Sequence, residues 1–374
     1  MDRLSGPRRL LGDIGSLSLR RPLRVMNVCG GHERTITMSG IRTALPALLE
    51  LIPGPGCPVC VCPEEDIRAA IALAVERRVT LLAFGDMLRV PVNGPRDTIR
   101  SLMQARAAGA RVEAVASPQE VVRRALYSPH EEFVFFAAGF ETTMAPVAAM
   151  LREGAPENLT VLLSGRRTWP AVEMLLASGD VRFDALIAPG HVATVMGTEE
   201  WGLVASRYGI PVAIAGFTAE SLLSAVYAVT QQVIQGLCRL ENCYPAVARS
   251  YGNRHAQRVL DEVMEVTGAN WRGIGMIPDS GFALRETWRA HNARSRYQID
   301  SGSSPGRDAM PPGCACAQVV LGLIYPNQCP LYGKGCDPTT PLGPCMVSDE
   351  GACRIWWNGG MRRAERTSKQ PAPV

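Results

Sequence analysis

The amino-acid sequence predicts an α/β protein: two parallel-sheet units whose loops face one another across a cleft, followed by a cysteine-rich C-terminal segment. Three observations carry this prediction. Short apolar runs typical of buried strands alternate with helical segments of about ten to fifteen residues. This alternation pauses near residue 117 and then starts again. Six of the twelve cysteines fall between residues 314 and 353, in a stretch rich in glycine and proline.

The first unit is predicted over residues 22–117, after an arm at 1–21 that we expect to be flexible. Its alternation of strands and helices favours a parallel sheet with right-handed crossovers. Pro63 and the acids that follow it are typical of a helix start. The apolar and periodic stretches predict strands at 23–28, 49–52, 79–84 and 112–116, and helices after Glu33, at 64–78 and at 98–108.

The second unit is predicted over residues 118–235 and repeats the same order of elements. Beyond it we expect a C-terminal domain at 236–360 that holds the cysteine-rich stretch, and a flexible tail at 361–374. Glycine, serine and proline between 301 and 312 predict a loop. The predicted strands are 133–138, 159–163, 185–188 and 211–215, the predicted helices are 120–126, 146–152, 170–177 and 199–208, and most of 218–265 is expected to be helical.

The composition, charge and apolar runs of the chain indicate what class of protein it is. The chain has 374 residues, of which 47% are hydrophobic and 20% charged, as in an ordinary globular protein. No apolar run reaches the ~18 residues of a membrane span, and we expect no signal peptide at the start. The net charge of +4 comes without a nucleic-acid-binding motif. We therefore expect a cytoplasmic protein whose cysteines serve metal or redox chemistry, with neither nucleic acid nor a membrane as partner.

The stretch Gly54-Pro55-Gly56-Cys57-Pro58-Val59-Cys60 is the most informative motif. Its prolines fix backbone angles and its glycines permit unusual ones, so it predicts a turn of defined shape. The Cys-x-x-Cys spacing suits either a redox dithiol or two thiolates on one metal ion. The pair also precedes a predicted helix start, whose partial positive charge favours the thiolate form. A structural or incidental pair of cysteines is the alternative.

Further polar residues follow the ends of other predicted strands. Cys29 and His32 follow the first strand, Asp86 follows a later one, and Glu141 and His191 follow strands of the second unit. In open parallel sheets, ligands bind beyond the carboxyl ends of the strands, so these residues are predicted to line one cleft. The alternatives are histidines satisfied in the core and, for the carboxylates, ordinary helix caps.

The C-terminal cysteines stand in a segment that lacks the periodic pattern of a hydrophobic core. Such a segment often folds around a metal centre, and four thiolates suit a 4Fe-4S cluster or a zinc ion. Free structural cysteines are the third alternative. Cys314 and Cys316 would face the same side of an extended segment, or be buried as small hydrophobic side chains. The candidate ligands are Cys329, Cys336, Cys345 and Cys353.

Taken together, these motifs resemble the HypD family, whose members help to build the iron centre of nickel–iron hydrogenases. The resemblance extends over residues 22–358. The motifs that carry it are Asn27-Val28-Cys29-Gly30-Gly31-His32-Glu33, Gly54-Pro55-Gly56-Cys57-Pro58-Val59-Cys60, Phe84-Gly85-Asp86-Met87-Leu88-Arg89-Val90-Pro91, Gly139-Phe140-Glu141-Thr142-Thr143, Ala188-Pro189-Gly190-His191-Val192, Tyr251-Gly252-Asn253 and the stretch from Cys345 to Cys353.

The resemblance implies two Rossmann-like α/β domains and a third domain with a 4Fe-4S cluster. It also implies a small HypC-like partner that, together with this chain, holds a transient mononuclear iron. Cyanide for this iron would come from a HypE-like donor, and the finished Fe(CN)2CO unit would pass to the hydrogenase large subunit. The chain would then be an assembly scaffold, with its cluster and dithiol supplying electrons, rather than a conventional turnover enzyme.

Carried over residue by residue, the resemblance implies that Cys29 is the iron ligand, with His32 beside it. Cys57 and Cys60 match a dithiol that exchanges electrons with the cluster. Cys62 departs from the family pattern, because it adds a third thiol and leaves the pairing of Cys60 open. The implied cluster ligands are Cys329, Cys336, Cys345 and Cys353.

Two other functions stay open on the sequence alone. One is a thiol–disulfide oxidoreductase that is fed by its cluster and binds no second iron. The other is an α/β enzyme for a small molecule with a structural zinc. Iron content separates the three functions, at about five irons per chain with the partner, about four, or none.

Overall fold

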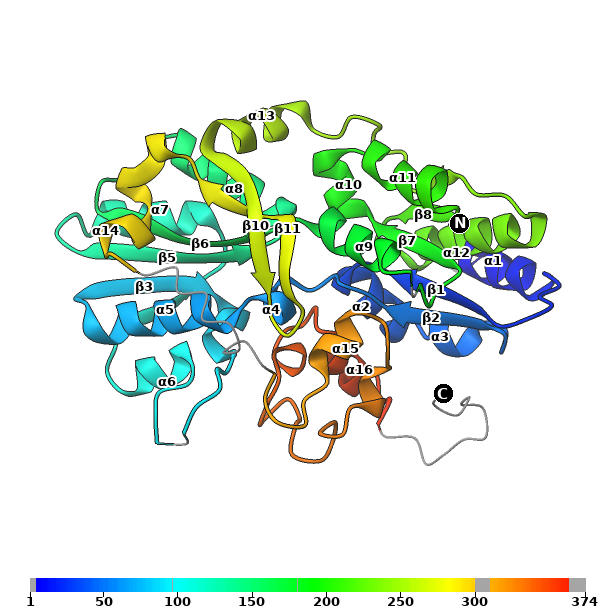
Figure 1. Ribbon diagram of the computed structural model, residues 1–374, viewed down its shortest axis with the longest axis horizontal. Coiled ribbons are helices and arrows are strands. Elements are labelled where there is room, and N and C mark those ends of the chain that lie inside the picture. Colours follow the sequence, from blue (N-terminus) through cyan, green and yellow to red (C-terminus); the bar gives the residue numbers. More distant parts are fainter. Residues whose placement is uncertain (1–4, 96, 180, 300–309, 363–374) are drawn as a thin grey trace.

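The computed structural model describes residues 5–95, 97–179, 181–299 and 310–362, and its strands form two sheets that lie side by side (Figure 1). Parallel pairing dominates both sheets, and helices cover their faces. This arrangement follows from the sequence, because short strands that are apolar on both sides need cover on both faces. The predicted α/β fold class, with two parallel-sheet units, is confirmed.

The first sheet has five parallel strands, in the spatial order β2 (Leu49–Pro53), β1 (Leu23–Asn27), β7 (Ala185–Pro189), β8 (Val212–Ala215) and β9 (Leu240–Asn242). Side chains alternate along β1, so Val25 packs on one face and Met26 on the other. The Val25 face is covered by α1 (Ser5–Gly15), α2 (Gly30–Met38), α3 (Ile41–Ala44) and α12 (Ala219–Gln235). The Met26 face is covered by α9 (Thr168–Ala177), α10 (Gly190–Met196) and α11 (Glu199–Tyr208).

The second sheet has six strands, in the order β10 (Met264–Trp271), β11 (Gly275–Leu284), β6 (Leu159–Arg166), β5 (Glu132–Gly139), β3 (Val79–Phe84) and β4 (Val112–Val115). The four strands from β6 to β4 are parallel, and β11 pairs antiparallel with both neighbours. One face is covered by α5 (Glu64–Glu76) and α6 (Leu102–Ala107), and the other by α7 (Pro118–Tyr127), α8 (Glu141–Arg152) and α13 (Arg254–Val263).

The two sheets do not follow the predicted division at residue 117. The chain builds β1 and β2 in the first sheet, crosses to the second for β3 to β6, returns for β7 to β9, and crosses again for β10 and β11. Each sheet therefore takes strands from both predicted ranges, 22–117 and 118–235. The reason is that local periodicity determines the type of an element, whereas the choice of partner strand depends on packing between distant segments.

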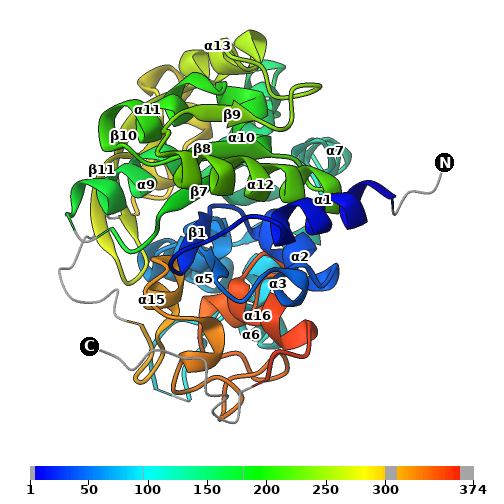
Figure 2. The ribbon, with the colours of Figure 1, turned by 90° about the vertical axis from the view of Figure 1, so that its right-hand side faces the viewer.

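The N-terminal end of the chain also differs from expectation. Most of the predicted arm at 1–21 is helix α1, which lies along α12 and buries Ile14 (Figure 2). The predicted flexible tail at 361–374 lies outside the described residues except for its first two positions. The predicted loop at 301–312 lies mostly outside them as well.

The predicted C-terminal domain at 236–360 divides in the structure. Its first part supplies β9, α13 and the β10–β11 hairpin to the two sheets. The described part from residue 310 onward forms the cysteine-rich segment, which lies below the sheets in Figure 1, in orange and red. Between these parts come η2 (Glu286–His291) and α14 (Ala293–Arg296), and the segment itself contains α15 (Cys316–Val320), η3 (Pro326–Gln328), η4 (Pro344–Met346) and α16 (Ala352–Asn358).

Candidate metal and redox site

The Cys57–Cys60 loop follows β2 and contains the one-turn helix α4 (Pro58–Val61). Proline fits the start of this turn, since a helix start needs no amide donor there. Cys57 caps the turn, because its sulfur accepts a hydrogen bond from the Cys60 amide at 3.1 Å. A disulfide joins the two cysteines, whose Cα atoms lie 5.3 Å apart. The loop therefore holds the pair in a geometry that allows a disulfide to form and open.

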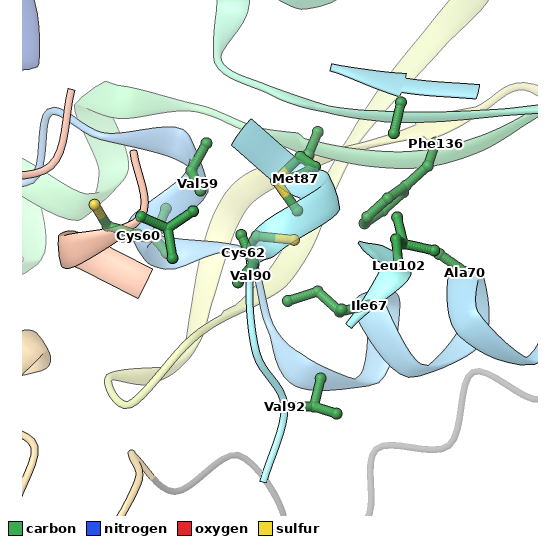
Figure 3. Close-up of a cluster of buried hydrophobic side chains, with 14 of the residues drawn as sticks. Val59, Cys60, Cys62, Ile67, Ala70, Met87, Val90, Val92, Leu102 and Phe136 are labelled. Atoms are coloured by element: carbon green, nitrogen blue, oxygen red, sulfur yellow. The ribbon is translucent and has the colours of Figure 1, made fainter. Parts of the chain in front are cut away.

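Cys62, the third thiol of this stretch, faces away from the disulfide. Figure 3 shows the Cys60 and Cys62 sulfur atoms pointing in opposite directions. The Cys62 sulfur lies 3.4 Å from the Ser164 hydroxyl, inside the hydrophobic core. Burial, and then the charge of Asp66, raise the pKa of Cys62 to about 12, so this thiol is protonated at neutral pH. In the structure, the pairing that the sequence left open is Cys57 with Cys60.

The turn after β1 places Cys29 beside the disulfide loop. Cys29 is the N-cap of α2, and the Gly30 amide donates a hydrogen bond to the Gly56 carbonyl at 3.0 Å. A β-carbon on Gly56 would lie 2.4 Å from the Cys29 backbone nitrogen, so this close approach of the two loops requires glycine. A β-carbon on Gly30 would lie 2.5 Å from Glu350 of the cysteine-rich segment. The glycines of both motifs thus allow three parts of the chain to meet.

A small pocket lies where these parts meet. Four cysteines line it: Cys29, Cys57 and Cys60 from the loops of the first sheet, and Cys345 from the cysteine-rich segment. Thiolates are the ligands that soft metal ions prefer, and a neighbouring disulfide adds the capacity to exchange electrons. The pocket therefore suits metal or redox chemistry, as the spacing of its cysteines predicts.

The surroundings of Cys29 favour a bound cation over a free thiolate. Burial is the main cause that raises the pKa of Cys29 to about 12, and the nearby Glu350 carboxylate raises it further. The backbone amides of His32 and Gly31, at the start of α2, act in the opposite direction. A thiol in this setting stays protonated until a metal ion displaces its proton.

The two predicted histidines flank an aromatic ring, that of Phe217. His191 stacks on this ring with 3.7 Å between centroids, and His32 lies at 4.9 Å with its ring tilted. The Nε2 atom of His32 donates to the Ala215 carbonyl at 3.0 Å, because a carbonyl oxygen can only accept. Burial lowers the pKa of His32 to about 4, so the ring is neutral and its Nδ1 carries a lone pair. Phe217 was not among the predicted residues, although it too follows the end of a strand, β8.

Glu141 lies outside the small pocket. It is buried, and its carboxylate accepts hydrogen bonds from the Thr168 amide at 2.6 Å and the Thr168 hydroxyl at 2.8 Å. Burial raises the pKa of this carboxyl. These contacts cap the start of α9, whereas the alternative drawn from the sequence was a cap at the helix that Glu141 itself begins, α8. Asp86 likewise accepts from Ser348 at 2.8 Å and ties the chain after β3 to the turn that carries Glu350.

The cysteine-rich segment gathers its thiols around one point. The sulfur atoms of Cys316, Cys345 and Cys353 are buried and lie within 4.8 Å of one another, close enough to hold a metal ion together. Cys314 extends the group, with its sulfur 3.3 Å from that of Cys316. A β-carbon on Gly343 would lie 2.6 Å from both of these sulfur atoms, so glycine leaves the space that they occupy.

Cys329 and Cys336 adjoin the same group. Their sulfur atoms accept hydrogen bonds from the amides of Ala315 and Leu342, at 3.5 and 3.4 Å. A hydrogen bond with Cys314 is the first cause that raises the pKa of Cys329. Amide donors directed at sulfur are typical of iron–sulfur sites, where they tune the cluster. The residues present therefore fit an iron–sulfur cluster.

The tightest group shares two members with the predicted ligand set. Cys345 and Cys353 belong to it, whereas Cys316 joins them where Cys329 and Cys336 were expected. The sequence left the role of Cys316 open, and its Cys-x-Cys spacing was the signal. The difference arises because α15 turns Cys316 inward, which the surrounding sequence pattern does not reveal.

No helix in the described parts of the chain combines the length and the apolar character of a membrane span.

The sequence matches the model of the HypD family, "Hydrogenase formation hypA family", over residues 8–360. It is 37% identical to hydrogenase maturation factor HypD of Rhodobacter capsulatus over 362 residues, which cover 96% of this chain and 94% of the relative.

Two further relatives show the same extent of similarity. Hydrogenase maturation factor HypD of Escherichia coli (strain K12) is 37% identical over 354 residues, covering 94% of this chain and 92% of the relative. Hydrogenase expression/formation protein HupD of Azotobacter chroococcum mcd 1 is 38% identical over 352 residues, covering 92% and 91%. With a family model and full-length relatives in agreement, the chain belongs to the HypD family of hydrogenase formation proteins.

Proposed function

We propose that this chain is a scaffold on which the Fe(CN)2CO unit of a nickel–iron hydrogenase is assembled before it passes to the hydrogenase large subunit. The observation that carries the proposal is the small pocket that unites Cys29, the Cys57–Cys60 disulfide and Cys345. An iron substrate needs a thiolate ligand and a nearby redox-active group. Cys29 can supply the thiolate, and the Cys57–Cys60 pair can supply two electrons once its disulfide has been reduced. Membership of the HypD family supports the same function.

In this proposal, Cys29 is the ligand through which the chain holds its iron substrate. Iron with cyanide and carbonyl ligands is soft and favours thiolate support. Cys29 suits this role because it lies in the pocket, at a helix start, and outside any disulfide. A HypC-like partner supplies a second ligand, and a HypE-like donor supplies cyanide. His32 supports the turn from within the same helix.

The Cys57–Cys60 pair handles the electrons of ligand attachment. Opening the disulfide takes up two electrons and two protons, and closing it again releases both electrons and both protons. A 4Fe-4S cluster held by the C-terminal thiols supplies single electrons when bound. Four thiols suffice for such a cluster, and the proposed set is Cys329, Cys336, Cys345 and Cys353.

Serine variants of single cysteines test the ligand set. Anaerobically purified protein should be brown and carry about four irons per chain in its cluster. Cys353→Ser should lose this iron, because Cys353 belongs both to the proposed set and to the tightest group of sulfur atoms. The proposed set also predicts loss in Cys345→Ser and retention in Cys316→Ser. The reverse result would put Cys316 in the place of Cys345, and colourless protein with bound zinc would contradict the cluster.

A second function deserves a test because the disulfide lies in the same pocket as Cys345. This arrangement also fits an iron–sulfur-dependent thiol–disulfide oxidoreductase that holds no iron substrate. Iron analysis of the chain with its partner separates the two functions, at about five irons per chain for the scaffold and about four for the oxidoreductase.

We further propose that the chain works in the cytoplasm as a one-to-one complex with a small HypC-like protein, whose N-terminal cysteine faces Cys29. The turn that carries Cys29 is only partly buried, so a partner can reach it. Native mass spectrometry of the co-expressed pair should show one species that contains both proteins. Two separate species at micromolar concentration would contradict the complex.

A further inference from the structure

We propose that Glu33 is a positioning residue that holds the Cys29 turn against the cysteine-rich segment through Trp356, and that this contact sets the iron affinity of Cys29. The inference rests on the proposed function, because it concerns iron held at Cys29. It follows from a side-chain contact between α2 and α16, whose two residues are 323 positions apart in the sequence.

The Glu33 carboxylate is buried, and both of its oxygen atoms accept hydrogen bonds. Oε1 accepts from the indole nitrogen of Trp356 at 2.6 Å and from the guanidinium of Arg42 at 2.6 Å. Oε2 accepts from the side-chain amide of Asn27 at 2.9 Å. The three donors come from α16, α3 and β1, so one carboxylate ties three elements to α2. Bonds to a buried, charged acceptor are the strong kind of hydrogen bond, and they hold the carboxylate in place.

The same contact links the two candidate metal-binding parts of the molecule. Glu33 lies one helical turn after Cys29, and its amide donates to the Cys29 carbonyl at 3.0 Å. Both residues line the small pocket. Trp356 lies on α16, three residues after Cys353, which belongs to the tightest group of sulfur atoms. A shift of Trp356 relative to Glu33 would therefore move the candidate iron ligand relative to the cluster thiols.

Packing on both sides of the indole keeps its N–H aimed at Glu33. The Arg42 guanidinium carbon lies 4.8 Å from the centre of the Trp356 ring, and the Tyr325 ring stacks on it at 5.4 Å. The helices also pack closely, since a β-carbon on Gly359 would lie 2.3 Å from the Thr37 side chain. Because the ring is held by these contacts, the N–H can be removed while most of the packing stays.

The variant Trp356→Phe tests the inference. It keeps an aromatic ring between Arg42 and Tyr325 and leaves the Glu33–Arg42 ion pair intact, so we expect it to fold and to retain its cluster. The full chain with its HypC-like partner is titrated anaerobically with ferrous ion against a competing chelator. We expect iron binding to weaken about 10- to 100-fold, the range typical when an outer partner of a metal ligand is lost.

A spectroscopic signature separates positioning from a purely structural role. Complexes isolated from cells that supply cyanide and carbonyl ligands should show broadened infrared bands in Trp356→Phe, because Cys29 is less firmly oriented. Glu33→Gln is the second variant and should weaken iron binding in the same direction. Both changes disturb the Glu33–Trp356 contact, and Glu33→Gln also weakens the bonds from Arg42 and Asn27. The double variant should therefore weaken iron binding by less than the two single effects combined.

The matched control is Glu50→Gln. Glu50 also accepts a hydrogen bond from an aromatic residue of the cysteine-rich segment, Tyr325, at 3.0 Å. It lies on β2, however, and its hydrogen bond and ion pair join it to Tyr325 and Arg24 rather than to α2. This control should bind iron as tightly as the unchanged chain.

The outcomes are distinguishable. Unchanged iron affinity and unchanged bands in both Trp356→Phe and Glu33→Gln overturn the inference and leave the proposed function standing. Loss of the cluster together with the iron in Trp356→Phe also overturns it, because the contact would then only support the fold. An unchanged chain that binds no iron beyond its cluster overturns the proposed function itself, before any variant is compared.

Discussion

Cys29 and Cys62 show that the position of a cysteine in the fold determines whether its thiol can serve as a ligand. Burial raises the pKa of each to about 12, so protonation alone does not distinguish them. Accessibility distinguishes the two thiols, because Cys29 lines a pocket with three other cysteines, whereas Cys62 faces Ser164 in the core. At the scale of the residue, a thiol becomes a candidate ligand through the side chains and the space around its sulfur.

Replacing Cys62 with alanine should leave the Cys57–Cys60 pair unchanged. The Cys62 sulfur points into the core (Figure 3), so the variant should lose packing and the contact with Ser164, with the free energy of unfolding lowered by about 1 kcal/mol. Redox titration of the pair and iron analysis are the measurements. A shifted potential of the pair, or lost iron, would show that Cys62 takes part in the site.

Glu200 provides a test of the electrostatics away from the pocket. Burial and the Glu141 carboxylate raise the pKa of Glu200 from 4.5 to about 7. In the window between these values the folded chain keeps a proton that the unfolded chain has released, so this group lowers stability as pH rises. Glu200→Gln cannot ionise, and its melting temperature relative to the unchanged chain should therefore be higher at pH 8 than at pH 5. An equal difference at both pH values would contradict the raised pKa.

At the scale of the element, the β10–β11 hairpin supports the disulfide loop. The hairpin reaches from α13 down to α4 (Figure 1), and the amide of Arg272 near its tip donates to the Val61 carbonyl at 3.0 Å. The Arg272 guanidinium is fully buried and donates to Glu64 at 2.7 Å and to the Pro91 carbonyl at 2.8 Å. An antiparallel hairpin at the edge of one sheet thus braces a loop that follows a strand of the other.

Arg272→Met should destabilise the fold strongly. It removes the buried partner of Glu64, whose other cation, Arg68, is partly exposed, and breaking a buried pair costs about 3 kcal/mol. Urea unfolding measures the loss. Glu64→Gln added to Arg272→Met should recover part of it, because no buried charge is then left over. Arg289→Met, at a position 69% exposed, is the control and should change stability by no more than about 0.5 kcal/mol. An equal effect of Arg272→Met and Arg289→Met would show that the buried pair is not what secures the hairpin.

At the scale of the whole molecule, the site forms where three distant parts of the chain converge. The turns after β1 and β2 supply Cys29 and the disulfide, and the cysteine-rich segment supplies Cys345. The segment can dock there because α16 packs on α2 and because η4 packs on α4. The assembly of the site therefore depends on the fold as a whole, although each cysteine belongs to a local motif.

The sequence predicted the elements well because periodicity and turn residues act locally. The strand at 79–84 and the helix at 199–208 have the bounds of β3 and α11. Sheet membership was not predictable in the same way. β1 pairs with β7, more than a hundred residues further along the chain, and no local pattern specifies that choice. Helix α1 was not predicted, because its apolar side chains become a buried face only when they pack against α12.

The site residues show the same difference between features that local sequence predicts and features that depend on packing of distant segments. The spacing of Cys57 and Cys60, together with the proline and glycine around them, was enough to predict a dithiol turn. The inward position of Cys316 and the place of Phe217 between His32 and His191 depend on packing between segments far apart in sequence. Glu141 was predicted to line the site because it follows the end of a strand, but this position alone does not bring it into the pocket.

The most direct test of the account compares Cys29→Ala with Cys57→Ala in complexes with the partner, by infrared spectroscopy and iron analysis on the same samples. If Cys29 holds the iron substrate and Cys57 with Cys60 carries electrons, Cys29→Ala should abolish the bands of iron-bound cyanide and carbonyl. It should also lower the iron content while sparing the cluster. Cys57→Ala should keep the cluster and most of the iron but stall ligand attachment. Equal loss of iron in the two variants would contradict this division and show that the three thiols form one metal site.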